Sequence, residues 1–370
     1  PTRRVTFSAA VGAAETYCPT LKTYNGDKVN VGCFNTYMGV FVPLTPDEIN
    51  PLYYFYKYDN PTKPYRRWRW DDPFEGERDD LLKPDDRVAM IIHGFTDNTD
   101  RPWMPQMRDA LFLGKNPEKL KVILVDWRKG AEGPKYAQAA RNVMMLARVS
   151  AELIYRLYTK YDLKERNIQL IGHSLGGQTV GKMIDWLYTN YNIKVGRATG
   201  LDVASPLFEE RRIQPDKTQA HYFESVHTSS GNNLLEGNFG LAANFSHLDI
   251  YPNGGIIKQP GCVLPPTTLH CSHDLSRPFY SELLIICNRG CSFEGTLCDS
   301  VMDAERKNCQ GDKIDLCARM AQLAESASDE DSDVVYFETQ EDKLVSECNK
   351  DWQTTLIKSF GDIMKLIKTG

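Results

Sequence analysis

This sequence of 370 residues lacks two features that would decide its class at once, a long apolar run and a long basic run. A helix that spans a bilayer needs about 20 consecutive apolar residues, and no stretch here reaches that length. The net charge is -5, whereas nucleic-acid-binding domains concentrate lysine and arginine on one surface. We therefore expect no transmembrane segment and no nucleic-acid partner.

Two further absences concern the cysteines and the start of the chain. The sequence has none of the paired CxxC knuckles of structural zinc sites, and it begins at Pro1 with no charged-then-apolar leader. It nevertheless contains 10 cysteines, an even number and more than a typical reduced cytosolic chain carries. These observations predict a secreted, disulfide-bonded protein, read here as a processed mature chain.

Short apolar runs alternate with helical patterns from residue 88 onward, and no internal repeat is evident. The runs are "VAMIIHGF", "KVILVDW", "NIQLIGHS", "RATGLDV" and "FESVHTSS". Continuous apolar runs separated by helices are typical of a parallel sheet that is buried on both faces. Residues 136–161 contain no proline or glycine and carry apolar residues at near-helical spacing, which predicts a long crossover helix. The sequence therefore predicts an α/β architecture.

The sharpest chemical signal is "GHSLGG", in which Gly172, His173, Ser174, Leu175 and Gly176 join a predicted strand to a predicted helix. A glycine-serine cluster can simply form a turn. In the strand-to-helix setting, however, G-x-S-x-G is the nucleophile elbow of serine hydrolases, and the glycines let neighbouring backbone approach the strained turn. We expect Ser174 to be a nucleophile, with the positive end of the following helix directed at it.

A serine nucleophile needs a histidine base and a carboxylate that orients the base, in the chain order Ser, acid, His. Asp202 follows the next predicted strand in "GLDVASP" and fits the acid. Five histidines come later, at positions 221, 227, 247, 270 and 273. His221 and His227 lie in or beside a predicted strand and are interpreted as structural. The residues alone leave both His270 and His273 open as the base.

The segment "IIHGFTDN", residues 91–98, ends a predicted strand on a histidine and a glycine. Serine hydrolases stabilise the oxyanion of the tetrahedral intermediate with preorganised main-chain NH donors. One donor follows the nucleophile and the other lies in the loop after an earlier strand. We therefore expect the amides of Leu175 and Phe95 to form the oxyanion hole.

The chain resembles the pancreatic lipase family of secreted α/β-hydrolases, which includes phospholipases A1. The resemblance covers about residues 18–340 and rests on "INPLYYFYKYDNP", "HGFTDN", "VDWRKGA", "GHSLGG", "GLDVASP", "VHTSSG", "HLDIYPNGG", "PGC" and "CSH". It implies an α/β-hydrolase fold with a mostly parallel central sheet and helices on both faces. It also implies the triad Ser174, Asp202 and His273, because the family's histidine sits two residues after a cysteine, here Cys271.

The resemblance further implies three disulfides, which join Cys18 to Cys33, Cys262 to Cys271 and Cys298 to Cys309. Four other cysteines, at positions 287, 291, 317 and 348, can pair in three ways that the resemblance leaves open.

Two loops bear on the substrate. Only residues 263–270 separate the cysteines of the family's lid, a loop too short for the amphipathic flap of triacylglycerol lipases and similar to phospholipases A1. Residues 229–246 instead form a long loop, as in triglyceride-cleaving members. The combination resembles the pancreatic lipase-related enzymes of broader specificity. We expect phospholipase A1 activity, with a triacylglycerol lipase or galactolipase as the alternative.

The chain also departs from the family at its expected calcium segment and its end. Residues 211–221 offer Arg211 and Gln219 where the family has acidic groups, with Asp216 as the main carboxylate. Since calcium prefers several oxygen anions, we expect a weak or missing calcium site, no other metal site and no cofactor. About thirty residues follow the hydrolase region, so we expect no C-terminal β-sandwich domain.

We divide the chain into a lipase domain, residues 1–340, and a tail, residues 341–370. The tail predicts an amphipathic helix that packs on the domain or rests on an anionic membrane. Asn244 begins the N-glycosylation sequon "NFS" and is a candidate glycan site. We predict a Ser-His-Asp lipid esterase that acts at a lipid or membrane surface. The alternative from another class is a non-catalytic lipid-binding or storage protein, as the insect yolk proteins of this family are.

Overall fold

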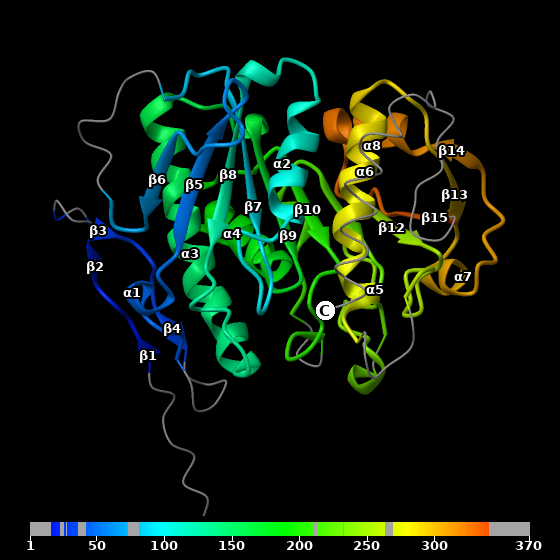
Figure 1. The fold of residues 1–370 in the computed structure, drawn as a ribbon, viewed down its shortest axis with the longest axis horizontal. Coiled ribbons are helices and arrows are strands. Elements are labelled where there is room, and N and C mark those ends of the chain that lie inside the picture. Colours follow the sequence, from blue (N-terminus) through cyan, green and yellow to red (C-terminus); the bar gives the residue numbers. More distant parts are fainter. Residues whose placement is uncertain are drawn as a thin grey trace, which may run out of the picture.

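A large twisted sheet organises the computed structural model of this chain (Figure 1). The structure describes residues 16–22, 26, 28–35, 42–72, 81–209, 213–231, 233–262 and 269–339. Within these residues the main sheet has 11 strands in the order β14-β13-β15-β12-β11-β10-β9-β7-β8-β5-β6. Strands that neighbour each other in space are often distant in sequence, as crossover connections require.

The centre of the sheet is parallel, from β8 through β7, β9, β10, β11 and β12 to β15. These strands are β7 (Arg87–Ile92), β8 (Leu120–Asp126), β9 (Ile168–His173), β10 (Arg197–Leu201), β11 (Phe223–Val226), β12 (Leu248–Pro252) and β15 (Asp333–Phe337). Strands β7 to β11 arise from the five apolar runs, so the structure confirms the predicted α/β architecture. Their carboxyl ends lie at one edge of the sheet.

Antiparallel strands lie at both margins of the sheet. On one side β5 (Leu52–Lys57) pairs with β8 and with β6 (Arg66–Arg69). On the other side β13 (Glu294–Cys298) pairs with β15 and with β14 (Lys313–Asp315). Two small sheets join β1 (Thr16–Tyr17) to β4 (Phe34–Asn35), and β2 (Leu21–Lys22) to β3 (Lys28–Val29).

Helices cover both faces of the sheet. They are α1 (Pro46–Ile49), α2 (Trp103–Phe112), α3 (Tyr136–Tyr161), α4 (Leu175–Tyr191), α5 (Cys271–Asp274), α6 (Ser276–Asn288), α7 (Val301–Glu305) and α8 (Leu316–Ser326). The predicted crossover helix over residues 136–161 is confirmed as α3, which ends where Asp162 adopts a left-handed conformation. None of the helices in the described ranges is both long and apolar enough to cross a bilayer.

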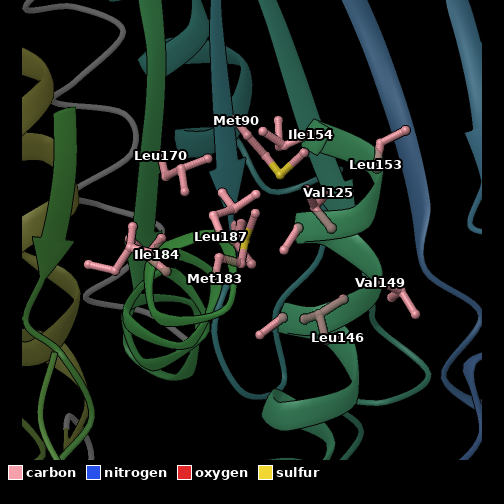
Figure 2. Packing of buried hydrophobic residues seen from close by; sticks show 14 of the residues in the cluster. Met90, Val125, Leu146, Val149, Leu153, Ile154, Leu170, Met183, Ile184 and Leu187 are labelled. Atoms are coloured by element: carbon pink, nitrogen blue, oxygen red, sulfur yellow. The ribbon is translucent and has the colours of Figure 1, made fainter. Parts of the chain in front are cut away.

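Strand β7 shows why two layers of helices are needed. Its side chains alternate between the faces, as in any strand: Met90 and Ile92 belong to one buried cluster, and Ala89 and Ile91 to another. Figure 2 shows the first cluster, in which Met90 lies among side chains of α3 and α4. Helices α2, α6 and α8 supply the second cluster. Burial of both faces holds the sheet edge, and the loops that leave it, in place.

The tail falls outside the described residues, which end at Thr339. The predicted division at residue 340 and the amphipathic helix of residues 341–370 therefore stay predictions.

Candidate active site

Ser174 occupies a strained turn between β9 and α4. Its backbone has φ 56° and ψ −120°, a conformation that residues with a side chain rarely adopt. A Cβ at Gly172 would lie 2.1 Å from the carbonyl oxygen of Gly176, and one at Gly176 would lie 2.2 Å from that of Ile92. Both positions therefore need glycine, as the elbow motif predicts. The turn presents Ser174 at the carboxyl edge of the sheet.

The loop after β7 lies directly against Ser174. A Cβ at Gly94 would fall 2.7 Å from the Cβ of Ser174, so only glycine lets this backbone approach so closely. His93 holds the loop: its ring accepts a hydrogen bond from the main-chain NH of Trp127 at 3.1 Å, and its carbonyl accepts one from the Trp127 indole at 2.8 Å. On the other side of Phe95, the Thr96 amide donates to Ala131 at 2.8 Å.

Phe95 thus lies between two anchored residues. Leu175 is the first residue of α4, where backbone NH groups have no acceptor within the helix. This placement is compatible with the predicted oxyanion donors Phe95 and Leu175, whose role stays a prediction.

Asp202 and His273 form a buried pair beside the turn. Asp202 follows β10, is fully buried, and accepts a hydrogen bond from Nδ1 of His273 at 2.5 Å. The amides of Thr228 and Ser229 donate to its other oxygen at 2.7 and 3.0 Å, and the Ser229 hydroxyl donates to the first. Burial alone would raise the pKa of Asp202, but the hydrogen bonds from His273, Ser229 and Thr228 outweigh it and lower the pKa. The carboxylate is therefore held ionised, as an orienting acid must be.

The other four later histidines are engaged elsewhere. His221 contacts Glu165 at 2.8 Å, His227 contacts Asp249 at 2.8 Å, and His247 accepts from the Phe223 amide at 2.9 Å. His270 stacks on the ring of Phe239, with centroids 5.0 Å apart. The structure thus brings His273, and not His270, to Asp202. His273 lies in the short helix α5.

His173, inside the elbow motif, supports the same helix. Its Nε2 donates to the carbonyl of His273 at 3.3 Å, and the two ring centroids are 4.7 Å apart. Burial, and then the charges of Arg277 and His273, put the pKa of His173 well below its usual range. His173 is therefore neutral and acts through its hydrogen bond.

One pocket of about 940 Å³ contains Ser174 and His273 in its lining. The apolar and aromatic residues of its lining include Phe95, Tyr136, Pro206, Leu234, Phe239 and Leu269. The charged residues of its lining include Asp97, Asp100, Arg101, Asp274 and Arg277. The lining therefore offers both apolar and polar groups to a ligand.

Residues 41–343 of the chain match the sequence model of the family described as Lipase. The chain belongs to the Lipase family. It is 31% identical over 241 residues to pancreatic lipase-related protein 2 of Cavia porcellus, which covers 65% of this chain and 52% of that protein. It is 32% identical over 223 residues to pancreatic triacylglycerol lipase of the same species, which covers 60% of this chain and 45% of that protein. The chain spans about half the length of these curated relatives.

Among solved structures, this Lipase family chain is similar to Est1E from Butyrivibrio proteoclasticus, with 16% identity and a TM-score of 0.25 over 35% of this chain and 45% of that one.

The structure contains the three disulfides that the family resemblance implies, Cys18–Cys33, Cys262–Cys271 and Cys298–Cys309. It also joins Cys287 to Cys317, which removes two of the three open pairings. Cys271 of the Cys262–Cys271 disulfide lies two residues before His273 and is the first residue of α5. This disulfide therefore anchors the start of that helix. Cys348 and lid residues 263–268 lie outside the described ranges.

Polar side chains of the segment compared with the family's calcium site form hydrogen bonds with other groups of the protein. Asp216 accepts hydrogen bonds from the amide and the hydroxyl of Thr218 at 3.0 and 2.8 Å. Gln219 donates to Asp185 at 3.0 Å, and Arg211 lies outside the described residues. In the parts of the chain that the structure describes, no three His, Cys, Asp or Glu residues are grouped to hold a metal. The weak or missing calcium site stays a prediction.

The candidate glycan site lies in the long loop. Asn244 is exposed and donates to the Ser332 hydroxyl at 3.2 Å, while Ser246 of the sequon is buried and bonded to Ser225. A glycan on Asn244 would replace the contact with Ser332. Its presence stays a prediction.

Thr228 and Ser229 were not among the predicted site residues, although they hold Asp202. The sequence does contain a signal for them. Asp202 follows one predicted strand, and "VHTSSG" lies at the end of the next predicted strand in the chain. Strands β10 and β11 are parallel neighbours, with Leu201 opposite Val226. Residues just beyond their carboxyl ends therefore lie side by side.

Proposed function

We propose that this Lipase family chain hydrolyses carboxylic esters of lipids with a Ser-His-Asp triad. The observation that carries the proposal is the buried hydrogen bond between Asp202 and His273, beside a nucleophile elbow whose serine lines the same pocket as the histidine. Serine hydrolases on unrelated folds share this set of roles.

In the proposed reaction, Ser174 Oγ attacks the acyl carbonyl carbon while His273 Nε2 takes the hydroxyl proton. The developing oxyanion accepts hydrogen bonds from the Phe95 and Leu175 amides, each worth about 3 to 4 kcal/mol in comparable enzymes. When the ester C–O bond breaks, His273 returns the proton to the leaving alcohol. A water molecule then attacks the acyl-serine by the same route, which releases the fatty acid and restores Ser174. Asp202 holds the tautomer of His273 that carries a proton on Nδ1.

Phospholipase A1 is the specificity we propose for this activity. The lid loop has only eight residues between its cysteines. Charged lining residues such as Asp100 and Arg101 suit the polar headgroup of a phospholipid better than they suit a triacylglycerol. The long loop of residues 229–246 favours the second candidate, a triacylglycerol lipase of broad specificity.

A lipid surface is the partner we propose, and secretion the localisation. The loop of residues 229–246 carries two neighbouring leucines, of which the first lines the pocket. Leu234 lines it, and Leu235 has 88% of its surface exposed. Exposed leucines beside a site for lipid esters favour contact with acyl chains. Disulfides favour an oxidising compartment.

The deciding experiment uses phosphatidylcholine with different labelled acyl chains at its two positions, and a triglyceride emulsion in parallel. Release of the sn-1 chain with little release from the emulsion supports phospholipase A1, whereas strong release from the emulsion supports the lipase. Ser174→Ala gives the background for both.

A non-catalytic lipid-binding protein is the candidate from another class. A fluorophosphonate probe that labels the folded chain but not Ser174→Ala would exclude it. Absence of labelling, together with no ester cleavage above the Ser174→Ala background, would favour it.

A further inference from the structure

Arg277 lies in the first turn of α6 and is 7% exposed, although it carries a charge. Its Nη1 contacts Asp97 at 3.0 Å and its Nη2 contacts Asp274 at 2.7 Å. The remaining nitrogen, Nε, donates to the main-chain carbonyl of Asp274 at 3.1 Å. All three guanidinium nitrogens are therefore engaged, and each partner lies in a segment that leads to the proposed active site.

Asp97 follows Phe95 by two residues in the oxyanion loop. Its carboxylate also accepts the indole NH of Trp103 at 2.8 Å and the Asn98 amide at 2.8 Å. It therefore fixes both the loop and the start of α2. The partner on the other side, Asp274, directly follows His273 in the sequence. Arg277 thus joins the segment that carries an oxyanion donor to the segment that carries the base, across 180 residues of sequence.

A second path connects the same two segments. The Arg277 guanidinium carbon lies 5.3 Å from the centroid of the Trp103 ring. The rings of Trp103 and His173 pack in a T-shaped arrangement with their centroids 5.9 Å apart, and His173 donates to the carbonyl of His273. The contacts therefore close a ring around one wall of the pocket.

We propose that Arg277 is a positioning residue that sets the separation between the oxyanion loop and the catalytic histidine. The inference rests on the proposed function. A misplacement of about 1 Å at a reacting group can cost about 100-fold in rate, so the link need not touch substrate to matter. Arginine suits the task because its planar fork can contact two carboxylates at once, whereas lysine offers one compact charge.

Arg319 provides a matched control. It lies on α8 and also contacts two aspartates, Asp333 at 2.6 Å and Asp331 at 3.4 Å. Neither it nor its partners line the pocket. If a loss of kcat reflected only broken ion pairs, it should therefore be similar in Arg277→Met and Arg319→Met.

The test measures kcat and KM on a soluble p-nitrophenyl ester, together with the melting temperature, for the full chain. We expect Arg277→Met to lower kcat about 10- to 100-fold with KM within about twofold, and Arg277→Lys to restore little of it. Arg319→Met should lower the melting temperature but leave kcat unchanged. A kcat for Arg277→Met within about twofold of the wild type, per folded molecule, would overturn the proposal.

If Arg277→Met does not fold, Asp97→Asn and Asp274→Asn decide, since each keeps the side-chain shape but weakens one link. Lowered kcat with unchanged KM in both supports the bridge, and unchanged kcat in both overturns it. Wild-type activity equal to that of Ser174→Ala would instead refute the proposed function itself, and the role of Arg277 with it.

Discussion

Two carboxylates on neighbouring strands are equally buried but are stabilised by different partners. Asp202 follows β10 at the carboxyl edge of the sheet, and Glu224 lies within β11. Both are fully buried. Asp202 accepts hydrogen bonds from two main-chain amides, a serine hydroxyl and His273. Glu224 accepts them from the guanidinium of Arg197 and from the hydroxyl groups of Thr199, Tyr222 and Tyr280.

The difference teaches that burial alone does not mark a catalytic acid. Glu224 is bound to an arginine, which stays protonated at any relevant pH. Asp202 is bound to His273, and His273 lines the pocket together with Ser174. In the proposed mechanism only the histidine passes a proton to the substrate, so the partner of each carboxylate, and not its burial, separates the proposed orienting acid from a structural carboxylate.

The largest expected effect is on kcat, which should fall when Asp202 is replaced but not when Glu224 is replaced. Asp202→Asn should lower kcat on a soluble ester about 10⁴-fold, because an amide no longer holds His273 in the tautomer that leaves Nε2 free to accept a proton. Steady-state kinetics with the same ester would check this. Glu224→Gln is the control and should retain kcat, and an equal loss in both variants would remove the distinction.

For stability we expect the opposite order, with a larger loss in Glu224→Gln than in Asp202→Asn. Glu224→Gln leaves the Arg197 charge with weaker partners, and breaking a buried ion pair commonly costs about 3 kcal/mol or more. We expect the low end of that range, because the Arg197 side chain is 23% exposed. Urea unfolding of both variants would measure the loss. A smaller loss for Glu224→Gln than for Asp202→Asn would contradict the structural assignment of Glu224.

A smaller effect concerns pH. Because the native pKa of Asp202 is lowered by its hydrogen bonds from His273, Ser229 and Thr228, Asp202 contributes stability above the unfolded aspartate pKa of about 3.9. That contribution is lost as pH falls through the native pKa. The free energy of unfolding should therefore fall more steeply below about pH 4 in the wild type than in Asp202→Asn. Parallel curves from urea titrations across this range would show that the predicted linkage is absent.

The smallest predicted effect lies outside the buried pairs, at the pocket rim. Leu235→Ser should lower the rate on phosphatidylcholine vesicles by up to about 10-fold, since complete transfer of one leucine side chain to an apolar layer is worth about 1.5 kcal/mol or more and a surface leucine is transferred only in part. The rate on a soluble ester should not change. Met302→Ser is the control, because Met302 is also exposed but lies on α7. Equal losses in both variants would exclude a specific lipid contact at Leu235.

The sequence predicts the centre of the fold better than its margins. Strands β7 to β11 are visible as apolar runs because they are buried on both faces. Strands β6 and β14 are short, carry polar residues such as Arg66 and Lys313, and give no such signal. Each pairs with the strand that precedes it in the chain, β5 or β13, so the signal is missing because these strands are short and polar and not because their partners are distant in sequence.

The site residues also differ in how far the local sequence identifies them. The elbow around Ser174 is local, since strand, turn and helix follow one another. The choice between His270 and His273 required either family resemblance or three-dimensional structure, because both flank Cys271. The pairing of Asp97 with Arg277 has no local signal at all, since it forms only after α6 has packed beside the loop that follows β7.

The chain order of the site has a consequence during protein synthesis. Ser174 leaves the ribosome about a hundred residues before His273. At about 5 to 20 residues per second, the nascent chain carries its nucleophile for several seconds or more without a base. The helix that supplies His273 then docks onto a sheet in which β7 to β12 have already been made, whereas β15 follows it in the chain. On the proposed mechanism, activity would therefore wait until α5 and α6 have been made and have packed on the sheet.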